Sequence, residues 1–261
     1  MFLRSCLAIL LIAAALSPPA QESKAPDALT KPGVLLTFDD THVSEWVSAI
    51  PLLEKYNARA TFFVTRFDQL SAAQLDGLKK LKAAGHTIGC HGLRHIKAAE
   101  HTKAHGIGDY LAKEITPALA HMEQGGFSPT SFAYPMSNND ATTDDALLKT
   151  FRHLRTGTAP KAGQRYAEMD ILFTPMAQIA ERGCLTGKGI DRIGEAGKED
   201  ILAQLFEAMD RAAKEGEVLT LYAHNIAASG KGHHLSPLTL KKILAHGQKL
   251  DLRFYAFDEL P

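Results

Sequence analysis

The chain has 261 residues, of which 45% are hydrophobic, and this is enough for one substantial domain with its own core. Its 29 basic and 29 acidic residues give a formal net charge of zero. Because there is no basic patch and no acidic tail, the charge pattern argues against a nucleic-acid-binding protein.

The first 20 residues have the pattern of a secretory signal peptide. Arg4 gives a positive start, residues 6–16 form an apolar core, and residues 17–20 resemble a cleavage region. The apolar core is too short to span a bilayer, which favours a cleaved signal peptide. The alternative is that the segment stays uncleaved as an N-terminal anchor. Residues 21–32 are polar, contain two prolines and are typical of a linker. We therefore expect a secreted or periplasmic protein with no membrane span in the mature chain and one domain over residues 33–261.

Short apolar segments alternate with amphipathic ones through that domain. Strands are predicted over residues 34–40, 60–64, 86–90, 132–134, 153–156, 218–223 and 252–257. Helices are predicted from residue 45 to about 57, over 71–84 and 108–123, from residue 139 or 140 to 148, and over 199–214 and 238–246. The glycine-rich stretch 157–197 is the least regular, with a possible strand at 171–173. The alternation predicts an α/β fold with a parallel sheet, closed into a barrel.

The first predicted strand ends in two adjacent carboxylates, Asp39 and Asp40. The strand is continuous and apolar and follows the turn pair Pro32 and Gly33, which is typical of a buried strand. Two acids at the end of such a strand are costly unless their charge is compensated. A divalent metal does so by taking one carboxylate as a ligand and leaving the other as a base.

A matching cluster follows at residues 90–95, Cys-His-Gly-Leu-Arg-His. His91 and His95 are four residues apart, which lets two imidazoles reach one ion from a single turn of chain. Two histidines and one carboxylate leave open positions for water, as in a catalytic metal site. The pattern predicts Asp40, His91 and His95 as ligands and leaves Asp39 as the general base. Ligand softness favours Zn²⁺, while Co²⁺ and Ni²⁺ also suit this donor set.

Taken together, these motifs resemble those of the polysaccharide deacetylases, carbohydrate esterase family 4. Thr-Phe-Asp-Asp at residues 37–40 and the His-x-x-x-His spacing at 91–95 resemble the first two motifs of that family. Residues 131–135, Ser-Phe-Ala-Tyr-Pro, resemble its third motif, and residues 219–224, Leu-Thr-Leu-Tyr-Ala-His, resemble its fifth. The Phe-Ala-Tyr-Pro version is similar to members that act on exported β-1,6-linked acetylglucosamine polymers. The resemblance extends from about residue 33 to the C-terminus.

This resemblance implies a distorted (β/α) barrel with seven or eight strands, whose reactive groups lie at the C-terminal strand ends. It implies that Asp39 is the general base for a metal-activated water and that His224 is the general acid. Tyr134, next to Pro135, would donate its backbone N–H to the developing oxyanion. The pocket leucine of the family corresponds to Leu221, three residues before His224.

The chain departs from the family pattern in its second and third motifs. Gly92 stands where Ser or Thr usually follows the first motif histidine and steadies the metal loop. Ala133 stands where an Arg often pairs with the base, and Arg155, at the next strand end, is a possible substitute. The fourth-motif residue, which steadies the catalytic histidine, has Asp170 and Asp191 as candidates.

Three other residues leave alternatives open. His42 either faces the site or is a solvated loop histidine, which is the commoner case. Cys90 and Cys184 either form a disulfide in an oxidising compartment or stay free. Because Cys90 ends a predicted buried strand, the free thiol is favoured.

The sequence therefore predicts a metal-dependent hydrolase that removes acetyl groups, expected to be N-acetyl groups of amino sugars, from an acetylated oligo- or polysaccharide. One rival is a hydrolase of non-peptide amides or cyclic ureides, because allantoinase-like relatives share the fold; the signal peptide argues against it. The other is a catalytically degenerate carbohydrate-binding domain. Gly92 and Ala133 favour that domain, whereas the intact set of reactive acids and histidines argues against it.

Overall fold

The computed structural model describes residues 29–229 and 232–261. The expected signal peptide, residues 1–20, and most of the expected linker lie outside the described residues. The end of the linker already contacts the domain, since Lys31 pairs with Asp251 at 2.7 Å and the carbonyl of Pro32 accepts the N–H of Arg253. No helix in the described part of the chain combines the length and apolar character needed to cross a bilayer.

Seven parallel strands form a closed barrel. In barrel order they are β1 (Gly33–Asp40), β2 (Thr61–Val64), β3 (Thr87–Cys90), β4 (Ser131–Ala133), β5 (His153–Thr158), β7 (Cys184–Gly189) and β8 (Glu217–Ala223), and β8 pairs with β1 to close the ring. The predicted α/β barrel is confirmed.

Two further strands distort the barrel because β1 and β8 each change neighbour along their length. The start of β1 pairs with β11 (Arg253–Tyr255), and only its end pairs with β2. The start of β8 pairs with the antiparallel β6 (Phe173–Pro175), and its end pairs with β7. The sheet is therefore splayed at these two seams.

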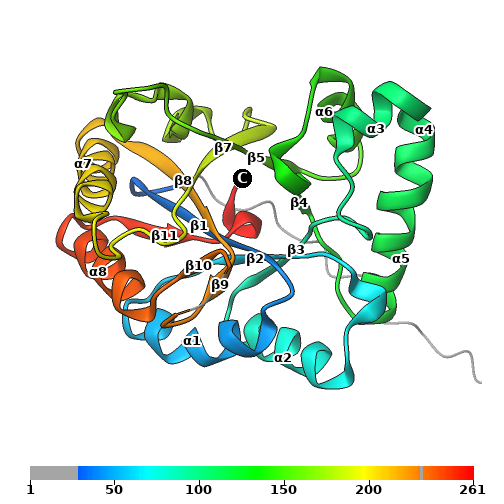
Figure 1. Ribbon diagram of the computed structural model, residues 1–261, viewed down its shortest axis with the longest axis horizontal. Helices are drawn as coiled ribbons and strands as arrows, with labels where there is room; N and C mark the ends of the chain where they lie inside the picture. Colours follow the sequence, from blue (N-terminus) through cyan, green and yellow to red (C-terminus); the bar gives the residue numbers. More distant parts are fainter. Residues whose placement is uncertain (1–28, 230–231) are drawn as a thin grey trace, which may run out of the picture.

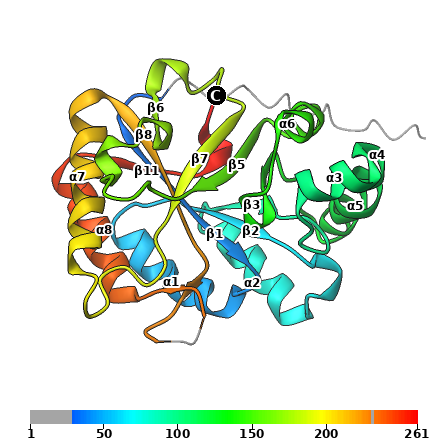
Figure 2. The ribbon, with the colours of Figure 1, turned by 45° about the horizontal axis from the view of Figure 1, so that its top comes forward.

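Helices surround the strands in both ribbon views, with α1 and α2 below, α3 to α5 on the right and α7 and α8 on the left (Figure 1, Figure 2). The helices are α1 (Val43–Lys55), α2 (Ala72–Ala83), α3 (Ala98–His105), α4 (Ile107–Tyr110), α5 (Thr116–Gln124), α6 (Ala141–Leu147), α7 (Glu199–Glu215) and α8 (Pro237–Lys249). Capping boxes at Ser71 and Asp140 begin α2 and α6, because each side chain accepts an otherwise unpaired backbone N–H. A short parallel pair, β9 (Asn225–Ile226) and β10 (His234–Leu235), follows β8.

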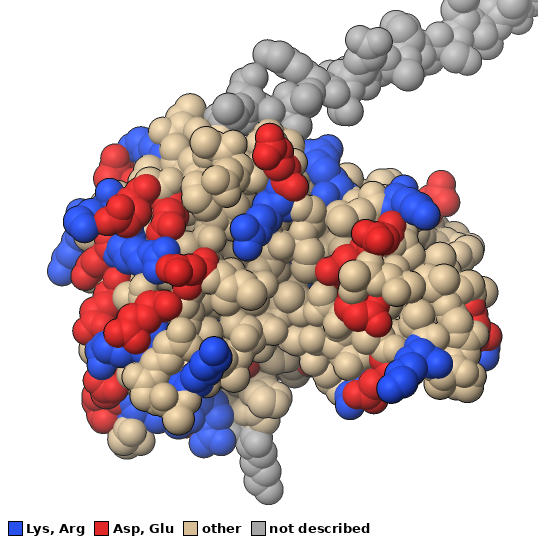
Figure 3. All heavy atoms as spheres, turned by 90° about the horizontal axis from the view of Figure 1, so that it is seen from above, with Lys and Arg blue, Asp and Glu red and all other residues tan. Residues whose placement is uncertain are grey.

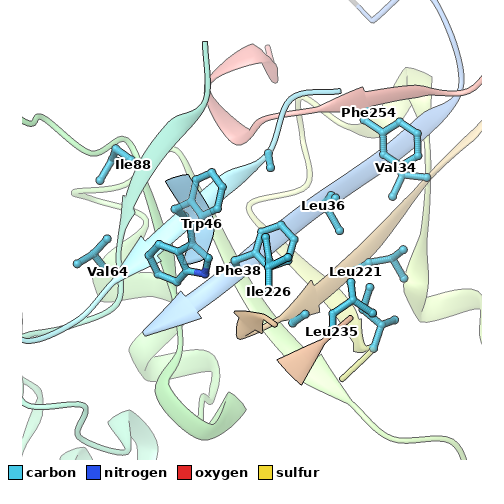
Figure 4. Packing of buried hydrophobic residues seen from close by; sticks show 14 of the residues in the cluster. Val34, Leu36, Phe38, Trp46, Val64, Ile88, Leu221, Ile226, Leu235 and Phe254 are labelled. Atoms are coloured by element: carbon cyan, nitrogen blue, oxygen red, sulfur yellow. The ribbon is translucent and has the colours of Figure 1, made fainter. Parts of the chain in front are cut away.

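Alternation along β1 decides which side chains enter the barrel. Val34, Leu36 and Phe38 point to the helices and join the large core cluster that includes Trp46 (Figure 4). The intervening Leu35 belongs to a second cluster with Phe63, Ala133, Leu185, Val218 and Phe257, contributed by other strands and the C-terminal 3₁₀ turn. Because successive strand residues point to opposite faces, Asp39 lies on the same inner face as Leu35.

Several element predictions differ from the structure. Strand β7 and helix α3 were not predicted, and residues 170–172 form a 3₁₀ turn that precedes β6. The helix predicted over 108–123 is divided into α4, a π-helical turn (Leu111–Ile115) and α5. On the face shown in Figure 3, basic and acidic side chains are interspersed.

Candidate active site

The sequence-predicted reactive groups meet at the C-terminal ends of neighbouring barrel strands. Asp39 and Asp40 end β1, His91 directly follows β3, and His224 directly follows β8. Strands β3 and β8 lie on opposite sides of β1, with β2 between β1 and β3. Parallel strands place their carboxyl ends at one edge, so these side chains gather at one end of the barrel.

Asp40, His91 and His95 form a three-residue cluster suited to a metal ion. Asp40 Oδ1 lies 3.9 Å from His91 Nε2 and 3.6 Å from His95 Nε2. The three ligand atoms lie within 4.8 Å of one another, so a single ion can reach all of them. His91 is buried, whereas Asp40 and His95 remain 30% and 23% exposed. The cluster is therefore open to solvent on one side.

A hydrogen bond fixes His91 in the orientation that a ligand needs. Its Nδ1–H donates to the carbonyl oxygen of Ala133 at 2.8 Å, which leaves Nε2 with a free lone pair directed toward Asp40. Burial lowers the pKa of His91 to about 4, so the imidazole is neutral at pH 7. A neutral imidazole with its other nitrogen held by a carbonyl is the state in which histidine binds transition metals, so these residues fit such an ion.

Asp39 is paired with Arg155, and the pair is buried inside the barrel. Arg155 Nη2 donates to Asp39 Oδ2, and the two side chains are 1% and 4% exposed. The guanidinium lies 5.5 Å from the ring centre of Phe63 and 4.7 Å from that of Tyr222, which fixes its plane. Arg155 on β5 is thus the partner of Asp39, as the sequence suggested when it offered Arg155 as a substitute for the Arg absent at Ala133.

The two oxygens of Asp39 have different environments. Oδ2 receives the Arg155 bond, whereas Oδ1 is buried and has no hydrogen-bond partner among the described residues. Burial alone would raise the pKa of Asp39, but the charge and hydrogen bond of Arg155 and the charge of His224 outweigh it and hold that pKa below its usual value. Asp39 is therefore an ionised carboxylate with one free acceptor oxygen inside the barrel.

His224 is held by Asp191, which accepts two hydrogen bonds from it. The backbone N–H of His224 donates to Asp191 Oδ1 at 3.0 Å, and its ring Nδ1–H donates to Oδ2 at 2.7 Å. Trp46 Nε1–H also donates to the carbonyl of His224 at 2.9 Å. Of the two fourth-motif candidates, Asp191 therefore contacts the histidine, whereas the 91% exposed Asp170 pairs with Arg211.

Asp191 also favours the protonated form of His224. Burial alone would lower the pKa of His224, but the hydrogen bond that its ring donates to Asp191 and the nearby charge of Asp39 outweigh it and raise that pKa above its usual value. Because Nδ1 is committed to Asp191, Nε2 carries the proton that can be transferred. The imidazolium is thus prepared to act as a proton donor.

We expect Asp191→Asn to shift the alkaline limb of the pH profile of kcat/KM to lower pH. The neutral amide lowers the pKa of His224, and activity that requires the imidazolium is lost as the pH rises through that pKa. Above it, kcat/KM should fall about tenfold for each pH unit. Asp170→Asn, at the rejected candidate, is the matched control and should leave the profile unchanged. An unchanged alkaline limb in Asp191→Asn would contradict this role.

Three predicted substrate contacts are not supported by the geometry. The backbone N–H of Tyr134 donates to the carbonyl of Arg155 at 2.9 Å, in the β4–β5 pairing, so the prediction that it receives an oxyanion is wrong. The ring of Tyr134 packs on Phe132 at 5.2 Å, and Pro135 is buried. Leu221 has no exposed surface and belongs to the core cluster outside the barrel wall (Figure 4), so its predicted place in the substrate pocket is also wrong.

The structure also places His42 and the two cysteines, for which the sequence left alternatives open. His42 is half-buried, and burial lowers its pKa; the charges of Asp40 and His224 also act on that pKa, so His42 lies near the site. Cys90 and Cys184 are free thiols, which confirms the favoured interpretation, and burial raises the pKa of Cys90 to about 12.

Glu114 was not singled out from the sequence, although its side chain is hydrogen-bonded to the loop that carries His91 and His95. It accepts the backbone N–H groups of Arg94 and Ile96, each at 2.8 Å. The spacing along the predicted helix could have pointed to it, because a residue recurs at every fourth position on one buried face: Tyr110, Glu114, Ala118 and Met122. A lone acid on an otherwise apolar helical stripe indicates a buried partner.

Comparisons with known proteins agree with the motifs. The family model described as polysaccharide deacetylase matches residues 27–151, a segment that contains Asp39 and the Asp40–His91–His95 cluster. A search of curated proteins found no match.

Solved structures share the fold across nearly the whole chain. One is a polysaccharide deacetylase from Bacillus cereus, which is 17% identical with a TM-score of 0.52, and the match covers 87% of this chain and 92% of that one. Another is a carbohydrate esterase family 4 enzyme from Streptococcus mutans, which is 16% identical with a TM-score of 0.53, and the match covers 87% of this chain and 86% of that one. The catalytic domain of a peptidoglycan N-acetylglucosamine deacetylase from Eubacterium rectale is also similar, with 19% identity and a TM-score of 0.50, and the match covers 90% of this chain and 93% of that one. The likeness to the Phe-Ala-Tyr-Pro subgroup stays a prediction. The family match, the motifs and the barrel therefore agree: residues 27–151 match the polysaccharide deacetylase family, and the chain shares its fold with solved structures of carbohydrate esterase family 4.

Proposed function

We propose that this protein is a secreted or periplasmic, metal-dependent deacetylase that hydrolyses N-acetyl groups of amino sugars in an acetylated oligo- or polysaccharide. The observation that carries the proposal is the convergence of three groups at one end of the barrel. These are a metal-type cluster, a buried base with a free oxygen, and a histidine held by a carboxylate. The localisation rests on the sequence of residues 1–20 alone.

Asp40, His91 and His95 would hold the metal, which their donor set favours as Zn²⁺ over Co²⁺ or Ni²⁺. When bound, the ion supplies a Lewis acid that acidifies a water molecule and polarises the acetyl carbonyl. Two imidazoles and one carboxylate leave coordination positions for these two oxygens. This division of labour leaves Asp39 free for proton transfer.

Asp39 and His224 move the protons of the reaction. Asp39 Oδ1 accepts a proton as the water oxygen bonds to the acetyl carbon, while Arg155 holds Oδ2 in place. His224 Nε2 then donates its proton to the leaving nitrogen as the carbon–nitrogen bond breaks. The products are acetate and a free amine. Asp191 orients the imidazole throughout this sequence.

The test is acetate release by the full chain after chelation and after re-addition of Zn²⁺ or Co²⁺. Substrates are a simple acetyl ester, chito-oligosaccharides and acetylated bacterial polymers. We expect release only with metal, and the best substrate defines the substrate class. No release on any of them with metal bound would instead favour the amide or ureide hydrolase. No release without measurable metal binding would favour the degenerate carbohydrate-binding domain.

A further inference from the structure

The loop that carries both candidate metal histidines lacks the hydroxyl residue that usually steadies it in this family. Gly92 occupies that position, with φ at +75°, a left-handed conformation that favours glycine. His95 also has a positive φ, +62°, which is unusual for a residue with a side chain. A loop held in this way requires other contacts to maintain its shape.

The carboxylate of Glu114 fills the space beside Gly92. A Cβ atom added at Gly92 would lie 2.3 Å from Glu114 Oε1 and 3.0 Å from its Cδ, so no larger residue fits there while Glu114 keeps its place. Glu114 thus stands where the side chain of a serine or threonine would otherwise begin. The glycine and the glutamate are therefore complementary.

Glu114 also binds the backbone of the loop on both sides of His95. Its Oε2 accepts the N–H of Arg94 and its Oε1 accepts that of Ile96, each at 2.8 Å, while its backbone carbonyl accepts the N–H of Leu93 at 3.2 Å. Hydrogen bonds to a carboxylate are stronger than those between neutral groups, and more so when the acceptor is buried. Glu114 has no exposed surface.

The position of Glu114 depends on a local departure from α-helical geometry. It lies in the π-helical turn Leu111–Ile115 between α4 and α5. A π-turn inserts one extra residue and rotates the side chains that follow, and such turns are frequent at functional sites. Here the turn accompanies a carboxylate directed at the loop between β3 and α3.

We propose that Glu114 is a positioning residue that holds residues 91–96 in the shape required for metal binding, in place of the hydroxyl residue absent at Gly92. This inference rests on the proposed metal site. It concerns the binding affinity, not the proton transfers, because the hydrogen bonds of the Glu114 side chain go to the backbone of the loop that carries the two histidines. The expected consequence of its loss is a weaker site with an otherwise intact barrel.

The test measures Zn²⁺ affinity of the purified full chain by competition with a chromophoric chelator. Glu114→Gln puts an amide N–H₂ against one of the two backbone N–H donors, so we expect Zn²⁺ to bind about 10–100-fold more weakly. Glu123→Gln, on the exposed face of α5, is the matched control and should bind like the unmodified protein. A folded Glu114→Gln protein with unchanged Zn²⁺ affinity would overturn the proposal.

Two further measurements cover the cases in which that variant does not fold. Gly92→Ala drives a methyl group into the carboxylate from the opposite side and should also weaken Zn²⁺ binding. In the unmodified, metal-free protein, the amide protons of Arg94 and Ile96 should exchange slowly with solvent. Rapid exchange of both amides in the folded protein would overturn the proposal without any variant. If these amide protons exchange slowly in a protein that binds no Zn²⁺, the proposed metal dependence is contradicted. The hydrogen bonds from Arg94 and Ile96 to Glu114 would still be established.

Discussion

Replacing Asp39 with asparagine is expected to lower kcat/KM about 10²–10⁴-fold, the usual contribution of a general base. The amide has nearly the same shape as the carboxylate but cannot accept the proton of the attacking water at Oδ1. Because Asp39 is outside the Asp40–His91–His95 cluster, the variant should still bind one Zn²⁺. Acetate release and metal content, measured on the same preparation, check both parts of the expectation.

The control for this substitution is Asp76→Asn on the exposed surface of α2, where the carboxylate lies 3.7 Å from Lys79. It makes the same chemical change far from the site and should leave activity unaltered. Full activity in Asp39→Asn would exclude Asp39 as the base. Loss of Zn²⁺ together with activity would instead assign Asp39 to the metal site.

Replacing Arg155 with methionine should lower the free energy of unfolding at neutral pH by about 3–5 kcal/mol, because it leaves the buried Asp39 carboxylate without its partner. Methionine retains an unbranched apolar chain between Phe63 and Tyr222, so the loss is mainly electrostatic. Activity should fall as well, since the base loses the contact that orients it. Urea unfolding of the variant, with metal removed from all samples, measures the stability change.

A double-mutant cycle separates this electrostatic effect from lost packing. Asp39→Asn combined with Arg155→Met removes both charges, so the double variant should be more stable than the sum of the single losses predicts. Arg165→Met removes an exposed partner of Glu207 and should cost much less. Additive losses in the cycle, or an Arg155→Met protein as stable as the original, would show that the buried pair does not stabilise this fold.

Features that depend on a few neighbouring residues were predictable. The apolar run that ends in Asp39 and Asp40 identified β1, and the four-residue spacing of His91 and His95 identified the other two residues of the candidate metal cluster. The helix starts at Ser71 and Asp140 were also readable, because a capping side chain binds backbone only three residues away. Such signals are local, so one stretch of sequence contains all of their parts.

Strand β7 shows where this local information ends. Its sequence, Cys-Leu-Thr-Gly-Lys-Gly, has little strand propensity, and the segment is a strand because β5 and β8 supply hydrogen bonds on both of its sides. The error over Tyr134 has the same origin. Whether its N–H is free depends on the register between β4 and β5, which no local pattern encodes.

The sequence by itself determined which side chains are the candidates for the chemistry of this protein: two adjacent acids, two spaced histidines and a histidine after an apolar strand. Only the tertiary structure decided which groups support them. Arg155 reaches Asp39 across 116 positions, Asp191 reaches His224 across 33, and Glu114 reaches Arg94 across 20. The candidate reactive groups can be recognised in the sequence because their residue types and spacings are unusual, whereas their partners are ordinary residues. Barrel closure and strand register bring those partners within hydrogen-bonding distance, and both depend on the whole chain.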